Sequence, residues 1–352
     1  MTITVEILSG LHRKAPVAIL LTAGSQRILM DAGSGLECDD APWALPSDLD
    51  AVLISHDHVD HIGGLSRLPA GTPVYCTAVT ARALPSHLTL HTVPVRGTFS
   101  LGEWTVTTGS SGHAYGGIWF HIDVPVGLFY SGDISLESTF FHFDIPPAAR
   151  LALVDASYGL YDTPLSQQQD AFLSALPQPM LCPVPPSGRT AEMALLAFAH
   201  SAVSLTFDED CRSALTEMAR HNDGTLTPDC QPALQEVLAT SPTLDPTRTL
   251  IFAADPDGDT GTAGALRAQP QFTHRVVFTG HMTARAHQQW QNGELEFYRW
   301  NVHPTRQGLQ QLMGYLGCER CVPLFTPLHD LAQWQQALGC QLVTHPTIEL
   351  TT

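Results

Sequence analysis

One stretch constrains this chain more than any other: residues 55–64, with the sequence SHDHVDHIGG. It follows the largely apolar run 49–54 (LDAVLI), which predicts a buried strand. The glycine pair at its end, followed by Leu65 and Leu68, predicts a turn into a short helix. Histidines and aspartates are therefore concentrated where a strand ends, a place that can hold several side chains around one point.

These residue types favour a metal. Imidazole and carboxylate groups are ligands of zinc and of neighbouring transition metals. His56 and His58 alternate along an extended backbone and can reach one ion, whereas Asp60 and His61 lie one turn further and can reach a second. Two ions about 3.5–4 Å apart can hold a phosphate and lower the pKa of a bound water to about 7. The alternatives are a histidine-rich polar loop or a structural zinc, although a structural zinc prefers cysteine ligands and none lies nearby.

Other residues that can bind metal also follow apolar strands directly. Asp31, Asp133 and Asp155 each come after a predicted strand, as His56 does. Ligands placed on strand ends gather at one rim of a sheet, which is a rigid setting for an active site. We therefore expect these positions to lie together.

The 352 residues suffice for two domains, or for one large domain with an insertion. The first 160 residues read as successive strands, whereas strands and helices alternate from about 163 to 290. That alternation predicts a parallel sheet with helices on its faces.

Charge and composition bear on which classes of partner the protein can bind. The net charge is −17, and Lys14 is the only lysine, so the chain lacks the basic face that nucleic-acid binders usually carry.

No apolar run approaches the roughly 20 residues of a membrane span, and the N-terminus lacks a signal-peptide profile. Cys318 and Cys321 form the only C-x-x-C, which we interpret as incidental spacing, and free cysteines fit a reducing compartment. We expect a cytoplasmic protein without a membrane partner.

The motifs resemble a known family. The cluster 56–61, together with Asp31, His113 and Asp133, resembles the metallo-β-lactamase fold superfamily. Further stretches are similar to motifs of its β-CASP branch of RNA- and DNA-processing nucleases: 154–159 (VDASYG), 183–192 (PVPPSGRTAE), 278–281 (FTGH) and 301–305 (NVHPT). The resemblance covers nearly the whole chain.

The resemblance implies the fold and its division. The fold class would be α/β, an αββα metallo-β-lactamase sandwich with an inserted α/β β-CASP-like cap. The sandwich would be formed by residues 1–162 and 291–352, and the cap by residues 163–290. The active site would lie in the cleft between them.

The resemblance also implies residue roles. The metal ligands would be His56, His58 and His113 for one ion and Asp60 and His61 for the other, with Asp133 bridging. A hydroxide activated by the metal would attack phosphorus, and Asp60 would accept or steer its proton. Asp155 would orient a ligand histidine, and His303 would stabilise charge on the scissile phosphate. Ser187, Arg189 and Thr279 are candidates for binding neighbouring phosphates, and Asp31 and Asp57 would lie behind the ligands. The cofactor would be zinc, as one or two ions, or manganese.

The sequence departs from the family pattern at two places. Thr326 stands where the family has a metal-binding histidine, and His329, three residues on, is poorly spaced to replace it. Pro304 and Thr305 replace the small and acidic residues that usually follow the motif histidine. These departures predict a weak or absent second metal.

Three functions follow. The first is a metal-dependent nuclease that hydrolyses phosphodiester bonds of RNA or single-stranded DNA, in RNA processing or DNA repair. The second is a metallo-hydrolase of a small ester, thioester or phosphoester, which the negative charge suits better. The third is an inactive scaffold subunit of an RNA-processing complex, against which the intact ligand set argues. The sequence is also compatible with a homodimer.

Overall fold

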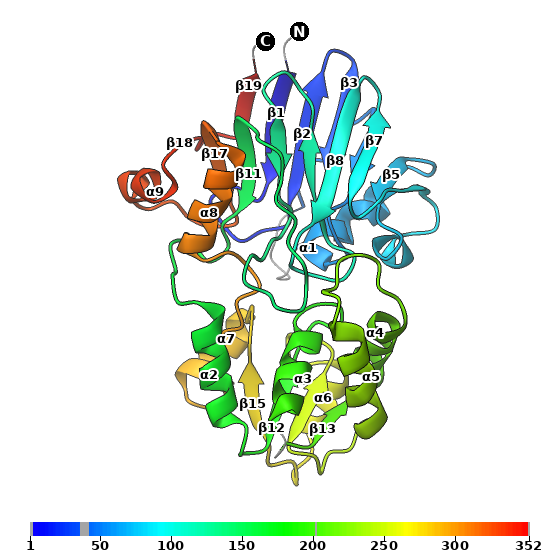
Figure 1. The fold of residues 1–352 in the computed structure, drawn as a ribbon, viewed down its shortest axis with the longest axis vertical. Coiled ribbons are helices and arrows are strands. Elements are labelled where there is room, and N and C mark those ends of the chain that lie inside the picture. The colour runs from blue at the N-terminus through cyan, green and yellow to red at the C-terminus, as the bar shows by residue number, and fades with distance from the viewer. Residues whose placement is uncertain (1–2, 36–41, 201–202, 351–352) are drawn as a thin grey trace.

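The computed structural model describes residues 3–35, 42–200 and 203–350. Two parts are visible in Figure 1: a sandwich of two sheets that carries both chain ends, and a helix-covered sheet below it. We call the second part, residues 165–297, the cap. The sandwich comes from both ends of the sequence, and the cap is inserted between them.

The first sheet of the sandwich has seven strands in the order β19-β1-β2-β3-β4-β5-β6. Its middle contains a hairpin, since β2 pairs antiparallel with β3. From β3 onward the pairing is parallel, so the chain leaves β3 and β4 at the same edge. The strands are β1 (Ile3–Ser9), β2 (Ala18–Ala23), β3 (Gln26–Met30), β4 (Ala51–Leu53), β5 (Pro73–Cys76), β6 (Thr89–Thr92) and β19 (Thr347–Leu350).

The second sheet also has seven strands, in the order β18-β17-β11-β10-β9-β8-β7. β7 to β10 are joined antiparallel, whereas β10, β11, β17 and β18 are parallel. The strands are β7 (Gly97–Leu101), β8 (Trp104–Ser110), β9 (Ile118–Ile122), β10 (Leu128–Tyr130), β11 (Leu151–Asp155), β17 (Arg320–Leu324) and β18 (Gln341–Leu342).

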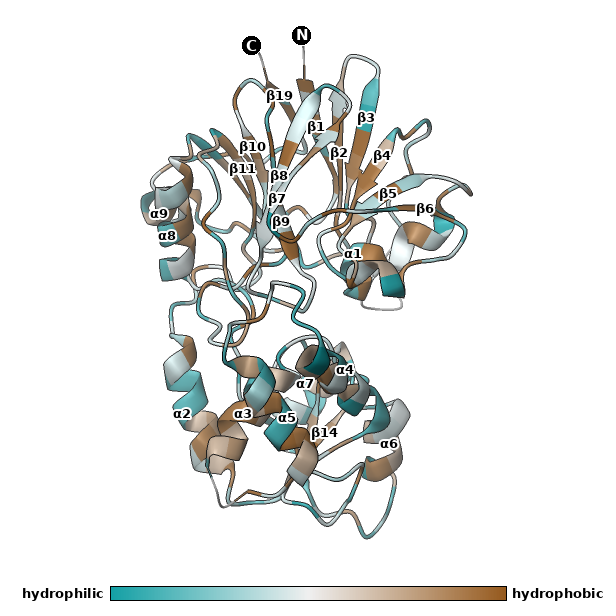
Figure 2. Cartoon of the chain, turned by 45° about the vertical axis from the view of Figure 1, so that its right-hand side comes forward, coloured by the Kyte–Doolittle hydropathy of each residue, from teal (hydrophilic) through white to brown (hydrophobic). Residues whose placement is uncertain are grey.

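The main core lies between these two sheets. Alternate residues of β1 point inward, and they join inward residues of β8, β9 and β11 in one buried cluster. The outer face of the second sheet is covered by α8 (Arg306–Leu316) and α9 (Leu331–Leu338). The outer face of the first sheet is covered by α1 (Val59–Ile62) with the 3₁₀ helix η1 (Gly63–Arg67) and by η2 (Thr80–Ala83). The two sheets, with helices on both outer faces, form the predicted αββα sandwich. Brown, hydrophobic segments are visible on several of its strands in Figure 2.

The cap is built on a five-stranded parallel sheet in the order β13-β14-β12-β15-β16. Its central strands are buried on both faces, which explains their continuous apolar sequences. The strands are β12 (Met180–Pro183), β13 (Leu205–Phe207), β14 (Leu250–Ala253), β15 (Arg275–Phe278) and β16 (Glu296–Phe297).

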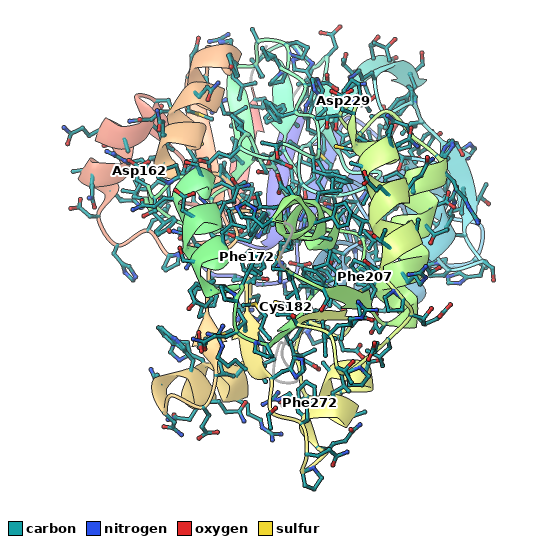
Figure 3. All side chains as sticks on the ribbon, turned by 60° about the horizontal axis from the view of Figure 1, so that its bottom comes forward. Asp162, Phe172, Cys182, Phe207, Asp229 and Phe272 are labelled. Carbon is teal, nitrogen blue, oxygen red and sulfur yellow. The ribbon has the colours of Figure 1, made fainter. Side chains whose placement is uncertain are left out.

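Helices cover both faces of the cap sheet, as the alternating pattern predicts. One face packs against α2 (Leu165–Ala175), α3 (Thr190–Ala199), α4 (Glu209–Arg220) and α5 (Cys230–Thr240). The other packs against α6 (Gly261–Arg267) and α7 (Ala284–Gln291). Phe172, Cys182 and Phe207, labelled in Figure 3, belong to the first of these clusters. The described cysteines are free thiols, as expected, and Cys38 lies outside the described residues.

The cap sheet continues past residue 290, where the sequence predicts the return to the sandwich. β16 begins at Glu296 and pairs in parallel with β15. A two-residue strand carries too little periodicity to indicate which sheet it joins, so the sequence could not place this boundary.

Glu192 connects the cap to the sandwich. This buried residue of α3 accepts hydrogen bonds from the Thr139 amide (2.7 Å) and the Ser138 hydroxyl (3.2 Å) of the loop after β10. It also accepts one from the Trp300 indole (2.9 Å), where the chain leaves the cap. A buried carboxylate needs such donors because its desolvation is costly, and here they come from two segments that are distant in sequence.

Gly33 brings the sandwich backbone close to the turn that holds Asp60. A Cβ at this glycine would lie 1.8 Å from the Asp60 carbonyl oxygen and 3.0 Å from Cβ of Pro16. We expect Gly33→Ala to lower the free energy of unfolding by about 1–3 kcal/mol because the turn must move. A urea titration measures this change.

Gly314 provides the matched control. It lies exposed in α8, and no described atom is within 4 Å of its added Cβ. Gly314→Ala should leave stability unchanged or raise it by about 0.5–1 kcal/mol through helix propensity. Equal losses in the two variants would contradict the steric explanation.

Candidate metal centre

The turn after β4 places the histidine-rich stretch at the sandwich edge that faces the cap. Its helix, α1, spans only four residues, and the His61 amide donates to the His58 carbonyl at 2.9 Å. The Asp60 carbonyl accepts from the Val17 amide at 2.9 Å. The His61 carbonyl accepts from the Ala32 amide at 2.8 Å. Neighbouring strand ends therefore fix the backbone that carries the ligands.

A first group of potential ligands consists of His56, His58, His113 and Asp133. Nδ1 of His58 lies 3.2 Å from Nε2 of His113. Oδ2 of Asp133 lies 3.7 Å from Nε2 of His113 and 4.0 Å from Nε2 of His56. Ligands of tetrahedral zinc at about 2.0–2.1 Å are separated by about 3.3 Å, so these spacings suit one ion.

Two further groups share Asp133. One consists of Asp60, His61 and Asp133, and the other of Asp133, Asp155 and His303. Nε2 of His61 lies 3.2 Å from Oδ1 of Asp133, and Nδ1 of His303 lies 3.7 Å from Oδ2. Asp133, only 2% exposed, is thus the point on which all three groups converge.

Unpaired buried atoms test whether this cluster fits a metal. Among the described residues, Nε2 of His56, Nε2 of His61 and Oδ1 of Asp133 are buried without a hydrogen-bond partner. Buried polar atoms in folded proteins are nearly always hydrogen-bonded, and leaving them unpaired costs free energy. The donor set of imidazoles and carboxylates therefore fits a divalent metal ion, which would satisfy these atoms.

Asp31 supports the cluster from behind. Its carboxylate accepts from the Ser55 amide (2.8 Å) and hydroxyl (2.7 Å), and from the Tyr130 hydroxyl (2.5 Å). It also pairs with Nδ1 of His61 at 2.7 Å. A carboxylate on one ring nitrogen fixes the orientation of the ring and leaves the other nitrogen for a metal. Asp31 therefore contacts His61 and Ser55 from the side away from Asp133, and its role behind the ligands stays a prediction.

Burial and charge set the protonation of the histidines. Burial and neighbouring His113 lower the pKa of His58 to about 3, and burial lowers that of His113 to about 4. Neutral imidazoles have a lone pair available for a metal. Burial acts in the same direction on His61, but Asp133 and Asp31 raise the pKa of His61 above its ordinary value.

Lys14 is a site residue that the sequence analysis did not select. Its Nζ lies 3.1 Å from Oδ2 of Asp60 and above the Phe325 ring, 4.8 Å from the centroid. Burial opposes its charge, yet Asp60, Asp133 and Asp155 together raise the pKa of Lys14 above its usual range. The one sequence signal that could have found it is that Lys14 is the only lysine of the chain.

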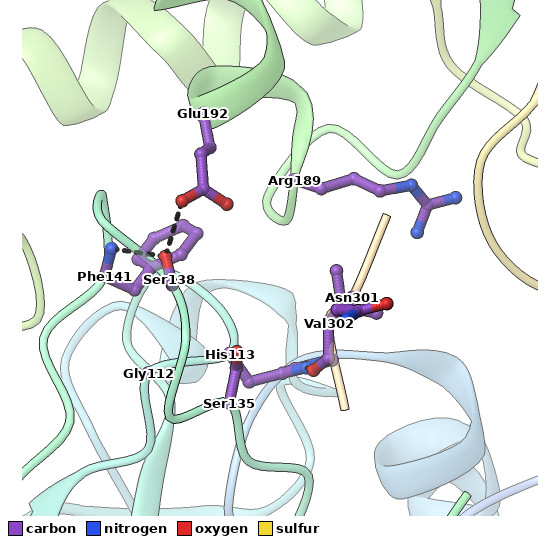
Figure 4. A pocket seen from close by; sticks show the side chains of 9 residues that line it. All are labelled: Gly112, His113, Ser135, Ser138, Phe141, Arg189, Glu192, Asn301 and Val302. Atoms are coloured by element: carbon purple, nitrogen blue, oxygen red, sulfur yellow. Dashed lines mark hydrogen bonds between the residues drawn. The ribbon is translucent and has the colours of Figure 1, made fainter. Parts of the chain in front are cut away.

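The candidates for phosphate binding divide into two places. Arg189 is buried and donates from Nε to the Thr279 hydroxyl at 2.8 Å. Ser187 instead donates to Oδ1 of Asp57 at 3.2 Å. Arg189 also lines a narrow pocket between cap and sandwich (Figure 4), whose other lining residues are Gly112, His113, Ser135, Ser138, Phe141, Glu192, Asn301 and Val302.

The other positions that the sequence analysis named are Asp57, Asp155, Thr326 and His329. Asp155 accepts from Nδ1 of His303 at 2.7 Å, so the histidine that it contacts is not one of the four predicted as ligands. Asp57 is outside the three ligand groups found among the described residues. Thr326 is buried, and His329 is exposed and belongs to none of those groups.

Comparison with known proteins identifies the fold family. A family model described as a beta-lactamase superfamily domain matches residues 26–141. This range contains the whole 56–61 cluster with His113 and Asp133. Residues 26–141 therefore form part of a metallo-β-lactamase superfamily domain. The predicted resemblance to its β-CASP branch is confirmed by the same match together with the relatives below.

Two curated relatives match part of this metallo-β-lactamase-fold protein. The transcription termination factor FttA of Methanocaldococcus jannaschii is 26% identical over 222 residues, which are 48% of this chain and 33% of the relative. Ribonuclease TTHA0252 of Thermus thermophilus is 32% identical over 176 residues, which are 40% of this chain and 41% of the relative. The match spans less than half the length of either relative.

A solved structure shares the fold along its full length. It is a protein of unknown function from Enterococcus faecalis, with a TM-score of 0.66 and 14% identity, covering 99% of this chain and 100% of the other. The likeness extends over the sandwich and the cap together. Within the described part of this protein, no helix has both the length and the apolar character needed to cross a membrane.

Asp31→Asn tests the support behind the ligands. We expect zinc affinity to fall about 10–100-fold, because an amide cannot accept from all its present donors and would release Ser55, whose hydroxyl lies 3.0 Å from Nδ1 of His56. Competition with a chromophoric chelator measures this affinity. Asp123→Asn, at an exposed aspartate of the same sandwich, is the control, and equal affinity in both variants would refute the role of Asp31.

Proposed function

We propose that this protein is a metal-dependent nuclease that hydrolyses phosphodiester bonds of RNA or single-stranded DNA. The observation that carries the proposal is the convergence of three ligand groups on Asp133 at the junction of sandwich and cap. The family match and a relative named as a ribonuclease support it. Phosphodiester hydrolysis needs a centre that combines metal ligands with a group for the transferring phosphate.

The first ligand group would hold the ion. We propose zinc at His56, His58, His113 and Asp133, with manganese as the alternative. When bound, the metal would lower the pKa of a water molecule and polarise a phosphoryl oxygen. Asp60 would accept the proton from the attacking water, since it faces the same centre through Asp133 and His61.

His303 would stabilise charge on the phosphate. Its Nδ1 is bonded to Asp155 at 2.7 Å, and Asp155 is itself held by the Ser157 amide (2.9 Å) and hydroxyl (2.7 Å). The ring is therefore oriented in advance, which leaves Nε2 for the substrate and requires little reorganisation during the reaction. Asp155 acts in this proposal as the residue that positions His303.

Phosphates next to the cleaved bond would be bound from the cap. Arg189 and Thr279 already contact each other, and a guanidinium can form two parallel bonds to a phosphate. Ser187 lies on the side of Asp57, where it could receive a second phosphate. We also propose a domain division of 1–162, 163–297 and 298–352, in which the second boundary moves from the predicted residue 290 to residue 297; the pairing of β16 with β15 supports this change.

A small phosphoester or ester is the second candidate substrate. The net charge of −17 opposes the approach of a long polyanion. Ser138 and Glu192, which both line the pocket, are also joined by a hydrogen bond of 3.2 Å. The intact ligand set argues against the inactive scaffold. A cytoplasmic location, a homodimer, and roles in RNA processing or DNA repair stay predictions.

Digestion of end-labelled single-stranded RNA and DNA tests the nuclease proposal. With zinc or manganese present, we expect the wild-type protein to cleave at least one polymer. His58→Ala should abolish cleavage by removing a ligand, and His303→Ala should lower the rate about 10²–10³-fold, as the loss of one charge-stabilising donor does.

His200→Ala is the control for both variants, because His200 is exposed and its ring bonds only within α3, to Leu196. Metal binding without cleavage of either polymer would exclude the nuclease. Hydrolysis of a nitrophenyl phosphodiester or ester under the same conditions would then support the small-substrate alternative.

A further inference from the structure

Lys14 is brought to the metal centre by a specific backbone contact. It lies in the loop between β1 and β2, and the Phe325 amide donates to the carbonyl of Gly10 in that loop at 2.8 Å. Leu11 forms a bridge with Leu324 next to this bond. The end of β17 therefore holds the loop in place, and the Lys14 ammonium reaches Asp60 at 3.1 Å.

The two principal ligand groups are unequal. The first has four ligand residues, whereas the second has Asp60 and His61 with the shared Asp133. Phe325, with a left-handed φ of 66°, lies beside the second group, with its ring 6.0 Å from that of His61. An apolar ring, which offers no metal ligand, thus lies beside this group, and Lys14 lies on that ring.

We propose that the Lys14 ammonium takes the place of a second metal ion beside Asp60, so that the protein binds one ion firmly, at the first group. A divalent ion on Asp60 would lie within a few ångströms of this ammonium, and like charges in a poorly hydrated site repel strongly. An ion in the first group would compensate the charge of Asp133, and the Lys14 ammonium compensates that of Asp60. The inference rests on the metal-binding part of the proposed function and is independent of the substrate.

Metal content after equilibrium dialysis tests the proposal. We expect one bound ion per wild-type chain and two per chain for Lys14→Met, which keeps a long unbranched side chain and removes its charge. Lys14→Arg retains the charge and should bind one. Zinc and manganese are dialysed in parallel, because thiolates bind manganese poorly and the free cysteines then do not add to the count.

Two results would overturn the proposal: two ions in the wild-type protein at micromolar free metal, or a single ion in the folded Lys14→Met variant. Thermal unfolding verifies that the variant is folded. Because dialysis is independent of catalysis, failure here would leave the nuclease test untouched, and failure of the nuclease test would leave the metal count valid.

Amine acylation provides a second measurement on the wild-type protein. Lys14 is the only lysine, so mass spectrometry of its peptide reports the accessibility of this one ammonium. We expect slow acylation that excess metal does not accelerate, and faster acylation in Asp60→Asn, which loses the ion pair. Acceleration by excess metal in the wild-type protein would mean that a second ion displaces Lys14, contrary to the proposal.

Discussion

The burial of the Asp133 carboxylate is the constraint on which the site depends. A carboxylate that is 2% exposed costs several kcal/mol to desolvate unless cations or hydrogen-bond donors compensate it. Its partners come from separate parts of the sequence: the 56–61 turn, the loop with His113, and the segment with His303. Strand ends from both sheets deliver them, so the sandwich must be assembled before the cluster exists. Asp31 completes the arrangement by holding His61 and Ser55 from the opposite side.

The cap contributes to the same junction. Glu192 of the cap accepts hydrogen bonds from the sandwich loop at Ser138 and Thr139 and from the exit segment at Trp300. The exit segment then continues to His303, and the Val302 carbonyl lies 2.6 Å from Nδ1 of His113. One short stretch therefore connects the cap, a potential metal ligand and the proposed phosphate-contacting histidine. A shift of the cap would consequently alter the geometry of the centre.

Much of this arrangement is predictable from local sequence, because strand ends gather at one edge and because His56, Asp31 and Asp133 directly follow apolar runs. The alternating pattern likewise predicts the parallel cap sheet. Contacts between distant segments are not predictable in this way. Lys14 meets Asp60 only because β17 holds its loop, and Glu192 bonds to Ser138 across 54 positions. The sheet that β16 joins and the helices α2 and α5 were also not predicted, since their apolar periodicity is weak. Contacts between residues that are distant in sequence can be identified only from the folded structure.

The central claim is that imidazole and carboxylate groups around Asp133 form the metal centre. X-ray absorption at the zinc edge of the protein loaded with one equivalent of zinc tests it most directly. The account predicts nitrogen and oxygen neighbours at about 2.0–2.2 Å with the outer-shell scattering of several imidazoles. Sulfur neighbours at about 2.3 Å would contradict it, because they would place the zinc on the thiols of Cys318, Cys321 and Cys340, which pack with α8 and α9.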